Sequence, residues 1–335
     1  MIVPGPRNLI TDLDGLLVGN AEDWRARTGT TVLLPRAPAA MAVDVRGGGP
    51  GTRDTEALAA DTLVEAFHAL VLSGGSVFGL AAADGVTGWL SARGIGLPMG
   101  PRAIPVVPAA ILFDLNNGGD KEWGEASPYA ALGRAACEAA SRDFSLGNAG
   151  AGVGAKAGSL KGGLGSASAF DADGVQVGAI VGANPWGEAV MPGSGALWSW
   201  PFELADEMGG QRGPACMPDT MPSGFPAAAP PVTNTVIAAV ATNVALGKGQ
   251  LKRVAMMAQD GIARAVRPAH TPFDGDTVFA VSTGSRAMAV TPLLLARIGA
   301  LAADCLARAI GRAVYEADSL GDKPGYRDWR RDQRG

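Results

Sequence analysis

Histidine, cysteine and aromatic residues are scarce in this chain of 335 residues, and the few histidines and cysteines limit the kinds of catalytic and metal site that it can form. Only His68 and His270 are present, so catalysis or metal binding that needs several histidines has few candidates. Cys137, Cys216 and Cys305 are far apart and form no CxxC pair, which argues against a disulfide framework or a zinc site. This cysteine usage fits a reducing compartment.

Long apolar runs and a dominant charge are missing too. The 28 basic and 32 acidic residues are interspersed along most of the chain, so no basic face for nucleic acid is indicated. No apolar run approaches the roughly 18 residues of a membrane-spanning helix, and the opening MIVPGPRNLITDLDG lacks the pattern of a signal peptide. We expect a soluble, cytoplasmic protein that binds neither nucleic acid nor a membrane.

Glycine and other small apolar residues are abundant instead. The 48 glycines cluster in apolar contexts, where they permit close backbone approach, and the 47% hydrophobic content can bury a large core. Helices are expected in pairs and strands are often consecutive, which favours layered α/β with mixed or antiparallel sheets. The expected strands are 30–35, 40–47, 103–115, 174–183, 236–244 and 277–283, and the expected helices are 54–72, 77–93, 128–141, 248–266 and 292–318.

Three short motifs suggest familiar enzymes but do not complete their patterns. TDLDG, at 11–15, is similar to the start of a phosphatase, yet no later acidic pair completes such a site, and an Asp-Gly turn is the better interpretation. The glycine-rich stretch 149–168 lacks the register of a phosphate-binding loop, so we expect a backbone-lined cavity wall. Ser76 comes nearest to the G-x-S-x-G frame of a hydrolase and fails at Phe78.

A proline-rich segment, 213–233, runs into the apolar strand NTVIAAVATNV through Asn234 and Thr235. On its own Thr235 is an ordinary strand residue, since threonine favours strands. If the bond between this pair were cut, Thr235 would carry a free α-amine with a pKa near ~8, able to act as general base for the adjacent hydroxyl. Such a nucleophile needs no histidine, no metal and no cofactor.

A second informative stretch is HTPFDGDTVFAVSTG, which begins at His270. Asp274 and Asp276 flank Gly275 immediately before a predicted strand, and residues two apart share a face if the strand already runs there. Three interpretations stay open: a β-turn that starts the strand, a metal clamp with His270, or a carboxylate pair that orients a nucleophile. One histidine and two aspartates are few ligands for a metal.

Over nearly its whole length the chain resembles the self-cleaving N-terminal-nucleophile hydrolases typified by the DmpA and BapA aminopeptidases and the NylC nylon-oligomer hydrolase. Two blocks are specific in their order and separation, TNTVIAAVATNVALGKGQLKRVAMMAQDGIARAV and HTPFDGDTVFAVSTG. The supporting blocks are NLITDLDGLLVGNAED, VDVRGGGPGTRDTEAL, LSGGSVFGLAAADGVTGWL, VPAAILFDLNNGG, LGNAGAGVGAKAG, LKGGLGSAS and VGAIVGANPWGE.

The resemblance implies a single domain, 1–335, folded as a four-layer αββα sandwich in which helices cover the outer faces of two sheets. It also implies that the precursor cuts itself between Asn234 and Thr235, giving an α-chain of 1–234 and a β-chain of 235–335.

Site residues carried over by motif surround that junction. Thr235 is similar to the family nucleophile, and Asp274 and Asp276 to the carboxylates that orient its amine or hydroxyl. Asn184, in GANPWG, matches the asparagine that helps to form the oxyanion hole. A family lysine near the nucleophile is matched by Lys161 in LKGG, with Lys156 as the other possibility.

The implied activity is hydrolysis of amide bonds in short peptides, β-peptides, D-amino-acid amides or 6-aminohexanoate oligomers. A threonine nucleophile places the chain nearer the nylon-oligomer branch, and Phe113 stands where some members carry a tyrosine. Acyl transfer of the ornithine-acetyltransferase type is the rival enzyme reaction, and an uncleaved scaffold is the non-enzymatic alternative. By resemblance we also expect a homotetramer.

Overall fold

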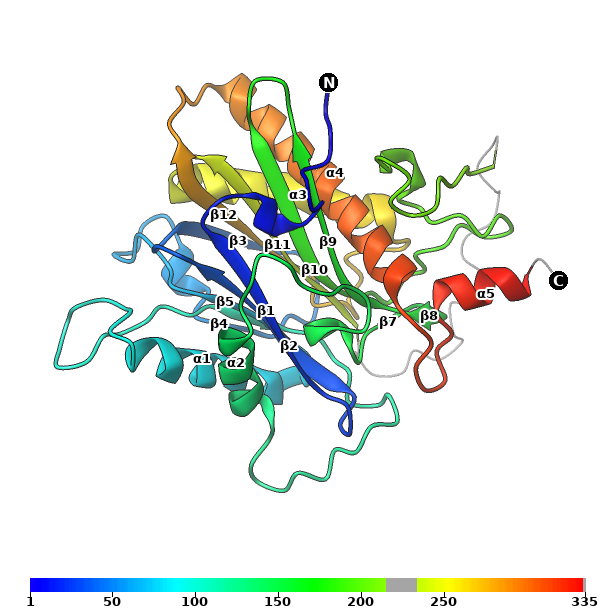
Figure 1. Cartoon of the computed structure of the whole chain (residues 1–335), viewed down its shortest axis with the longest axis horizontal. Helices are drawn as coiled ribbons and strands as arrows, with labels where there is room; N and C mark the ends of the chain where they lie inside the picture. The colour runs from blue at the N-terminus through cyan, green and yellow to red at the C-terminus, as the bar shows by residue number, and fades with distance from the viewer. Residues whose placement is uncertain (215–233, 334–335) are drawn as a thin grey trace.

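Two five-stranded sheets stacked face to face form the centre of the protein (Figure 1). The computed structural model describes residues 1–214 and 234–333. The predicted linker 213–233 and Cys216 therefore lie almost entirely outside the described residues. The first sheet has the order β3-β12-β11-β10-β9, made of Ala40–Val45, Thr277–Arg286, Thr235–Val244, Gln176–Asn184 and Gly163–Phe170. The second has the order β1-β2-β5-β6-β4, made of Leu16–Asp23, Thr28–Pro35, Leu70–Ser73, Ala109–Ile111 and Thr52–Arg53.

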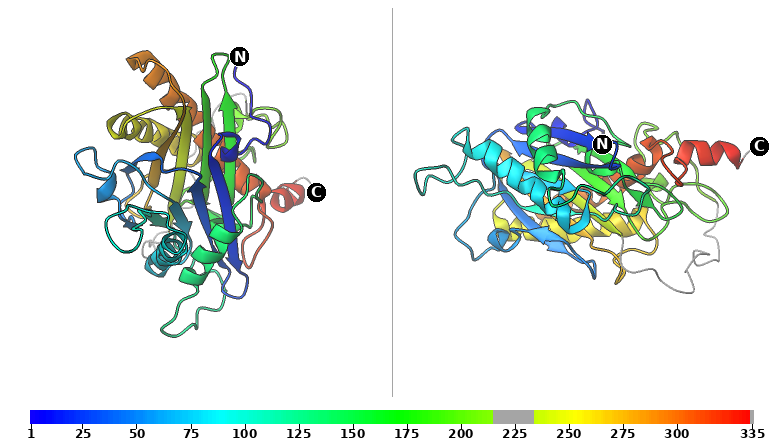
Figure 2. Two further views of the ribbon diagram at one scale, coloured as in Figure 1. Left: turned by 60° about the vertical axis from the view of Figure 1, so that its left-hand side comes forward. Right: turned by 90° about the horizontal axis from the view of Figure 1, so that it is seen from below.

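Two pairs of helices cover the outer faces of these sheets (Figures 1 and 2). α1 (Ala82–Ser91) and α2 (Tyr129–Glu138) pack on the second sheet, and α3 (Lys248–Ala265) and α4 (Pro292–Glu316) pack on the first. Besides short 3₁₀ turns and the elements above, the described residues form the short helix α5 (Tyr326–Asp332) and a two-stranded ribbon of β7 (Lys156–Ala157) and β8 (Leu160–Lys161).

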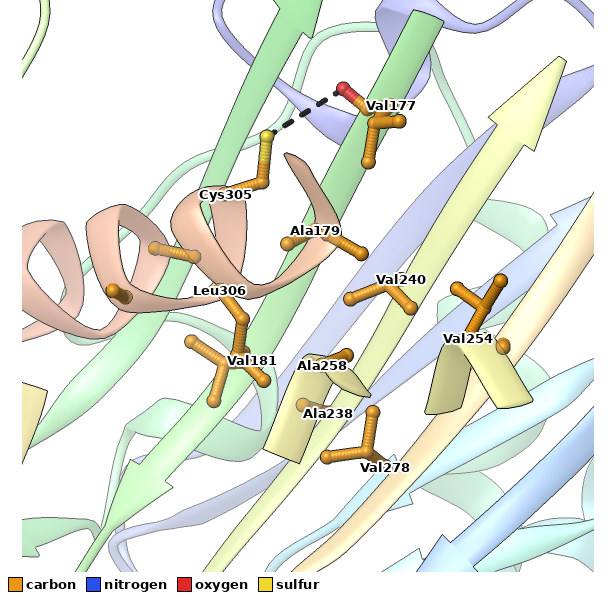
Figure 3. Close-up of a cluster of buried hydrophobic side chains, with 14 of the residues drawn as sticks. Val177, Ala179, Val181, Ala238, Val240, Val254, Ala258, Val278, Cys305 and Leu306 are labelled. Atoms are coloured by element: carbon orange, nitrogen blue, oxygen red, sulfur yellow. Dashed lines mark hydrogen bonds between the residues drawn. The ribbon is translucent and has the colours of Figure 1, made fainter. Parts of the chain in front are cut away.

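Three apolar cores separate the four layers. One lies between the two sheets and one under each helix pair. The cores under the helices consist mainly of Ala and Val, the core between the sheets holds more Leu, and aromatic residues are few in all three. Figure 3 shows the core under α3 and α4, where Leu306 and Ala258 meet Val181 and Val240 of the sheet. Small side chains allow the layers to approach closely. The expected αββα sandwich is thus confirmed.

The strand that begins at Thr235 is the middle strand of its sheet. β11 pairs antiparallel with β10, so that Thr235 lies opposite Asn184, and pairs parallel with β12 on its other side. All ten residues of β11 are buried, which agrees with its continuous apolar sequence. The register of these strands therefore determines which side chains meet at the amino end of β11.

The predicted helix over 54–72 is wrong. Only Glu56–Leu58 forms a 3₁₀ turn, and Leu70–Ser73 is a buried strand between β2 and β6. His68, predicted to lie in that helix, instead precedes the strand, and its Nδ1 accepts a hydrogen bond from the Val106 backbone N–H at 3.0 Å. Helical spacing in this segment is overridden because the sheet supplies partners for the apolar run at its end.

The strand predicted over 103–115 is too long, since only Ala109–Ile111 is paired in a sheet. Pro105 and Pro108 lack the N–H that a longer strand would need. The TDLDG stretch is a turn, as expected: Gly15 has a φ of 91° and the Asp12 carboxylate accepts from the Arg7 and Leu9 backbone N–H groups.

Candidate active site

Thr235, the predicted nucleophile, is buried at the first position of β11. Its hydroxyl donates a hydrogen bond to the carbonyl oxygen of Asn234, the residue on the other side of the predicted cleavage bond. The Gly275 backbone N–H donates to the same oxygen at 3.1 Å. The hydroxyl and a polarising donor are therefore gathered around one peptide carbonyl.

The loop 270–276 lies beside this bond because β12, which follows it, runs parallel to β11. A parallel bridge between Asn234 and Asp274 extends the pairing of the two strands back past Thr235. Gly275 packs so closely that a Cβ there would lie 2.8 Å from the Thr235 hydroxyl oxygen and 2.6 Å from the Gly49 carbonyl oxygen. Glycine at this position is what allows the loop to reach the threonine.

Asp276 holds the second residue of β11. Its Oδ1 accepts from the Val236 backbone N–H at 2.9 Å, and its Oδ2 meets His270 through both the backbone N–H at 3.1 Å and Nδ1 at 2.8 Å. His270 was considered as a metal ligand beside the two aspartates. In residues 1–214 and 234–333, no group of three or more His, Cys, Asp or Glu side chains is placed to hold a metal ion.

Asp274 holds the loop and the end of β10 together. Its Oδ1 accepts from the Trp186 backbone N–H at 3.0 Å, and its Oδ2 accepts from the Thr271 hydroxyl at 2.6 Å and backbone N–H at 3.0 Å. Burial, with a contribution from the charge of Asp276, raises the pKa of Asp274. Because β12 begins only at Thr277, the condition for a shared strand face is not met, and the two aspartates converge through the loop.

Asn184, the predicted oxyanion residue, is the last residue of β10 and lies opposite Thr235. Its side-chain amide is oriented by two backbones: Nδ2 donates to the Phe113 carbonyl at 3.1 Å, and Oδ1 accepts from the Lys156 N–H at 2.9 Å. This fixed amide is on the strand next to the Asn234 and Thr235 pair.

Lys161, the predicted assisting lysine, is buried in the short strand β8. Its Nζ donates to the carbonyl oxygens of Gly152 and Gly162 at 2.9 and 2.8 Å. Burial lowers the pKa of Lys161 to about 7, against the opposing charge of Asp114. Lys156, the alternative, pairs with Lys161 across the β7–β8 ribbon but is only half-buried.

A polar cavity of about 200 Å³ lies beside Asn184. Three parts of the chain line it: residues 113–114 and 116–117, residues 153–156 with 161, and residues 320 and 322–323. Phe113 and Lys156, which orient the Asn184 amide, both belong to its wall, and the buried Asp114 and Lys161 lie deeper. The glycine-rich stretch thus contributes a backbone-lined wall, as its sequence predicts.

Two features of the site were not found by sequence reasoning. Asp114 accepts from the Thr28 hydroxyl at 2.6 Å and the Gly75 N–H at 2.7 Å, and burial raises its pKa. The contact of His270 with Asp276 was also missed, although the spacing of six residues around a Pro-Phe pair places both in one tight loop. The only sequence signal for Asp114 was its place beside the asparagines in ILFDLNNGG.

Solved structures define the class of fold. A β-aminopeptidase from a Burkholderia species superposes with a TM-score of 0.72 at 22% identity, covering 100% of this chain and 95% of that one. The L-aminopeptidase D-Ala-esterase/amidase of Ochrobactrum anthropi, described as a variant of the Ntn hydrolase fold, superposes equally well at 23% identity, covering 99% and 95%. The fold is therefore that of an N-terminal-nucleophile hydrolase.

Sequence comparison gives the family. Residues 8–327 match peptidase family S58. An uncharacterized aminopeptidase of Mycobacterium tuberculosis is 42% identical, covering 96% of this chain and 97% of that protein, and a 6-aminohexanoate-oligomer endohydrolase of a Kocuria species is 33% identical over 86% and 78%. The chain belongs to peptidase family S58 and is a hydrolase of amide bonds. Among the described helices, none combines the length and the hydropathy that a membrane span requires.

Proposed function

We propose that this chain is a self-cleaving threonine hydrolase of short peptides or linear oligoamides, with Thr235 as its nucleophile. The observation that carries the proposal is the contact of the Thr235 hydroxyl with the Asn234 carbonyl, to which Gly275 donates a second hydrogen bond. This geometry suits attack of a hydroxyl on the preceding peptide carbonyl, and the buried neighbours exclude bulk water from the reacting atoms.

In maturation, Thr235 Oγ1 attacks the carbonyl carbon of Asn234, while the Gly275 N–H stabilises the charge that develops on the oxygen. The C–N bond breaks as the nitrogen takes up a proton, leaving an ester between Asn234 and the Thr235 side chain. Water then hydrolyses the ester, giving a carboxylate on Asn234 and a free α-amine on Thr235.

In turnover, the same hydroxyl attacks an amide carbonyl of the substrate. The new α-amine, with a pKa near ~8, accepts the hydroxyl proton and passes it to the leaving amine. Water then hydrolyses the resulting ester, which releases the acyl fragment as a carboxylate and restores the Thr235 hydroxyl. Asn184 donates to the oxyanion from the neighbouring strand, and Asp276 holds β11 in place through Val236. Lys161 assists proton transfer in its neutral form, which burial makes accessible near pH 7.

Mass analysis of the purified protein tests the maturation step. We expect two fragments under denaturing conditions, the smaller beginning at Thr235, and release of amine from aminoacyl p-nitroanilides or 6-aminohexanoate oligomers. Thr235→Ala should leave the chain intact and lower activity by at least about a thousand-fold, since the nucleophile is gone. Thr235→Ser, which keeps a hydroxyl, is the matched control. An intact wild-type chain with amidase activity would contradict the proposal.

The names of the relatives guide the choice of substrates. The Mycobacterium protein is called an aminopeptidase and the Kocuria protein an oligomer endohydrolase, so both substrate classes belong in the first screen. Amine acceptors should be included, because transfer of the acyl group to them would identify an acyltransferase. A homotetramer and a cytoplasmic location stay predictions.

A further inference from the structure

The polar cavity beside Asn184 contains two lysines, Lys156 and Lys323, that the proposed mechanism does not use. We name it the lysine pocket and define it by the lining residues 113–114, 116–117, 153–156, 161, 320 and 322–323. Its volume of about 200 Å³ is below the ~300 Å³ at which pockets for whole drug-sized ligands begin. It therefore suits one group of a longer molecule rather than a complete substrate.

The pocket is joined to the predicted active site by backbone hydrogen bonds. Asn184 is clamped between the Phe113 carbonyl and the Lys156 N–H, and both of these residues are in the pocket wall. A substrate whose carbonyl oxygen lies at Asn184 would therefore place a neighbouring group at the mouth of the pocket. This connection makes the pocket a candidate subsite of the amide hydrolase.

Two ammonium groups of the pocket are unsatisfied. Lys156 and Lys323 are each half-buried, and within the described part of the chain neither has a hydrogen-bonding or ion-pairing partner for its Nζ. Both side chains line the same cavity of about 200 Å³, and burial, followed by the charge of Lys323, lowers the pKa of Lys156. A like-charge pair held together without a counter-ion favours an anion between its members.

The acidic groups nearby do not fill that role. Asp322 lies on the exposed side of the pocket, and its charge raises the pKa of Lys156 by less than burial and Lys323 lower it. Asp114 is deeper, and its two oxygens already accept hydrogen bonds from Thr28 and Gly75. The ammonium of Lys161 is likewise held by two carbonyl oxygens. The charges left to meet a ligand are those of Lys156 and Lys323.

We propose that the lysine pocket binds a carboxylate of the substrate between Lys156 and Lys323. The inference rests on the proposed amide hydrolase and names its substrate class as short amides that carry a free carboxylate. That carboxylate is either the far end of the leaving fragment or an acidic side chain on the acyl fragment. Lysine ammonium groups recognise both, since each offers several donors to a carboxylate.

The first test compares matched substrates on the matured wild-type enzyme. The 6-aminohexanoate dimer is compared with its terminal carboxamide, and glutamyl p-nitroanilide with glutaminyl p-nitroanilide. We expect the acid of one pair to be preferred about tenfold in kcat/KM, and the pair that shows the preference identifies the source of the carboxylate. Equal rates within both pairs, or a preference for the amides, would overturn the inference.

Variants then assign the preference to the two lysines. In Lys156→Met and Lys323→Met the acid-to-amide ratio should fall toward one, whereas Lys323→Arg, which keeps the charge, should retain it. The ratio is the readout, so a general loss of activity cancels. Arg102→Met removes an exposed charge elsewhere and should leave the ratio unchanged. A preference that survives in the double methionine variant would contradict the assignment.

A direct binding measurement separates this inference from the proposed function. Butyrate is titrated calorimetrically into the wild-type protein and into Lys323→Met, with butyramide as the uncharged probe. We expect saturable binding of butyrate to the wild type alone, weakened by salt. Butyrate binding by a protein that neither cleaves itself nor hydrolyses amides would leave the pocket intact and refute the hydrolase mechanism. If an active enzyme did not bind butyrate, the proposal that the lysine pocket binds a carboxylate would be refuted.

Discussion

The acidic and the basic side chains near the Asn234 and Thr235 junction differ in how completely they are hydrogen-bonded. On the acidic side, each of the four oxygens of Asp274 and Asp276 accepts at least one hydrogen bond, from a backbone or from Thr271 and His270 side chains. On the basic side, Lys161 is held by two carbonyl oxygens, but Lys156 and Lys323 lack partners among the described residues. The oxygens of the two aspartates are thus all hydrogen-bonded, whereas, in the part of the chain that the structure describes, two of the three lysine ammonium groups are not.

This difference separates groups that shape the site from groups that can meet a ligand. A buried polar group without partners is unfavourable, so a carboxylate bonded at both oxygens is stable where it stands and can hold the backbone around it. Half-buried lysines avoid that penalty only by keeping water or binding an anion. The acidic side is therefore expected to act through geometry, and the basic side through proton transfer and binding.

The largest effect is expected from breaking the acidic side at Asp276. In Asp276→Asn only one side-chain oxygen remains, so an amide N–H must face either the His270 donors or the Val236 N–H, and the bridge from the loop to β11 would be broken at one end. We expect kcat to fall about 10³-fold, and cleavage of the precursor, followed by mass analysis over time, to slow. Asp84→Asn on the exposed face of α1 is the control. Activity within threefold of wild type would show that the acidic side does not position the nucleophile.

A smaller loss of activity is expected when Lys161, on the basic side, is replaced by arginine, which stays protonated. Burial lowers the pKa of Lys161 to about 7, so its amine is neutral above that pH and can accept a proton. We expect kcat/KM to fall as pH decreases through about 7. Lys161→Arg stays protonated, and should lower activity about 10²-fold and remove this dependence. An unchanged pH profile in the variant would assign the dependence to the Thr235 amine instead.

The smallest loss of activity is expected from a substitution of His270, whose Nδ1 contacts Asp276 Oδ2. Asparagine tolerates the positive φ of 55° at this position and keeps the backbone N–H bond, so His270→Asn should remove only the Nδ1 contact. We expect about a tenfold loss in kcat with little change in KM, and an unchanged melting temperature. A change confined to KM would instead place His270 against the substrate.

Helices and strands with long, unbroken apolar patterns could be predicted from the sequence. Strands whose patterns are interrupted by charged residues or glycines could not. The strand from Thr235 to Val244 and the helices α3 and α4 were expected within a few residues, because their apolar patterns are unbroken. β1 and β9 were missed, since charged ends and repeated glycines conceal their strand pattern. The error over 54–72 arose where tertiary pairing overrode local helical spacing.

The candidate site shows the same limit at the level of single residues. Thr235, Asn184, Asp274 and Asp276 could be chosen from motifs, and the structure places them around one strand end. The partners of each side chain could not be chosen, because they depend on strand register and loop packing. The lysine pocket is the clearest case: its segments are separated by tens to hundreds of residues, and no local pattern joins Lys323 to Lys156.

The order of strands in the first sheet has a mechanical consequence. β11 and β12, which follow the Thr235 junction, lie between β10 and β3, which precede it, and are paired to both. A cut at Asn234 would remove one covalent bond and leave every one of these ladders in place. The two fragments would then behave as an interlocked pair, which separates only when the sheet itself is denatured.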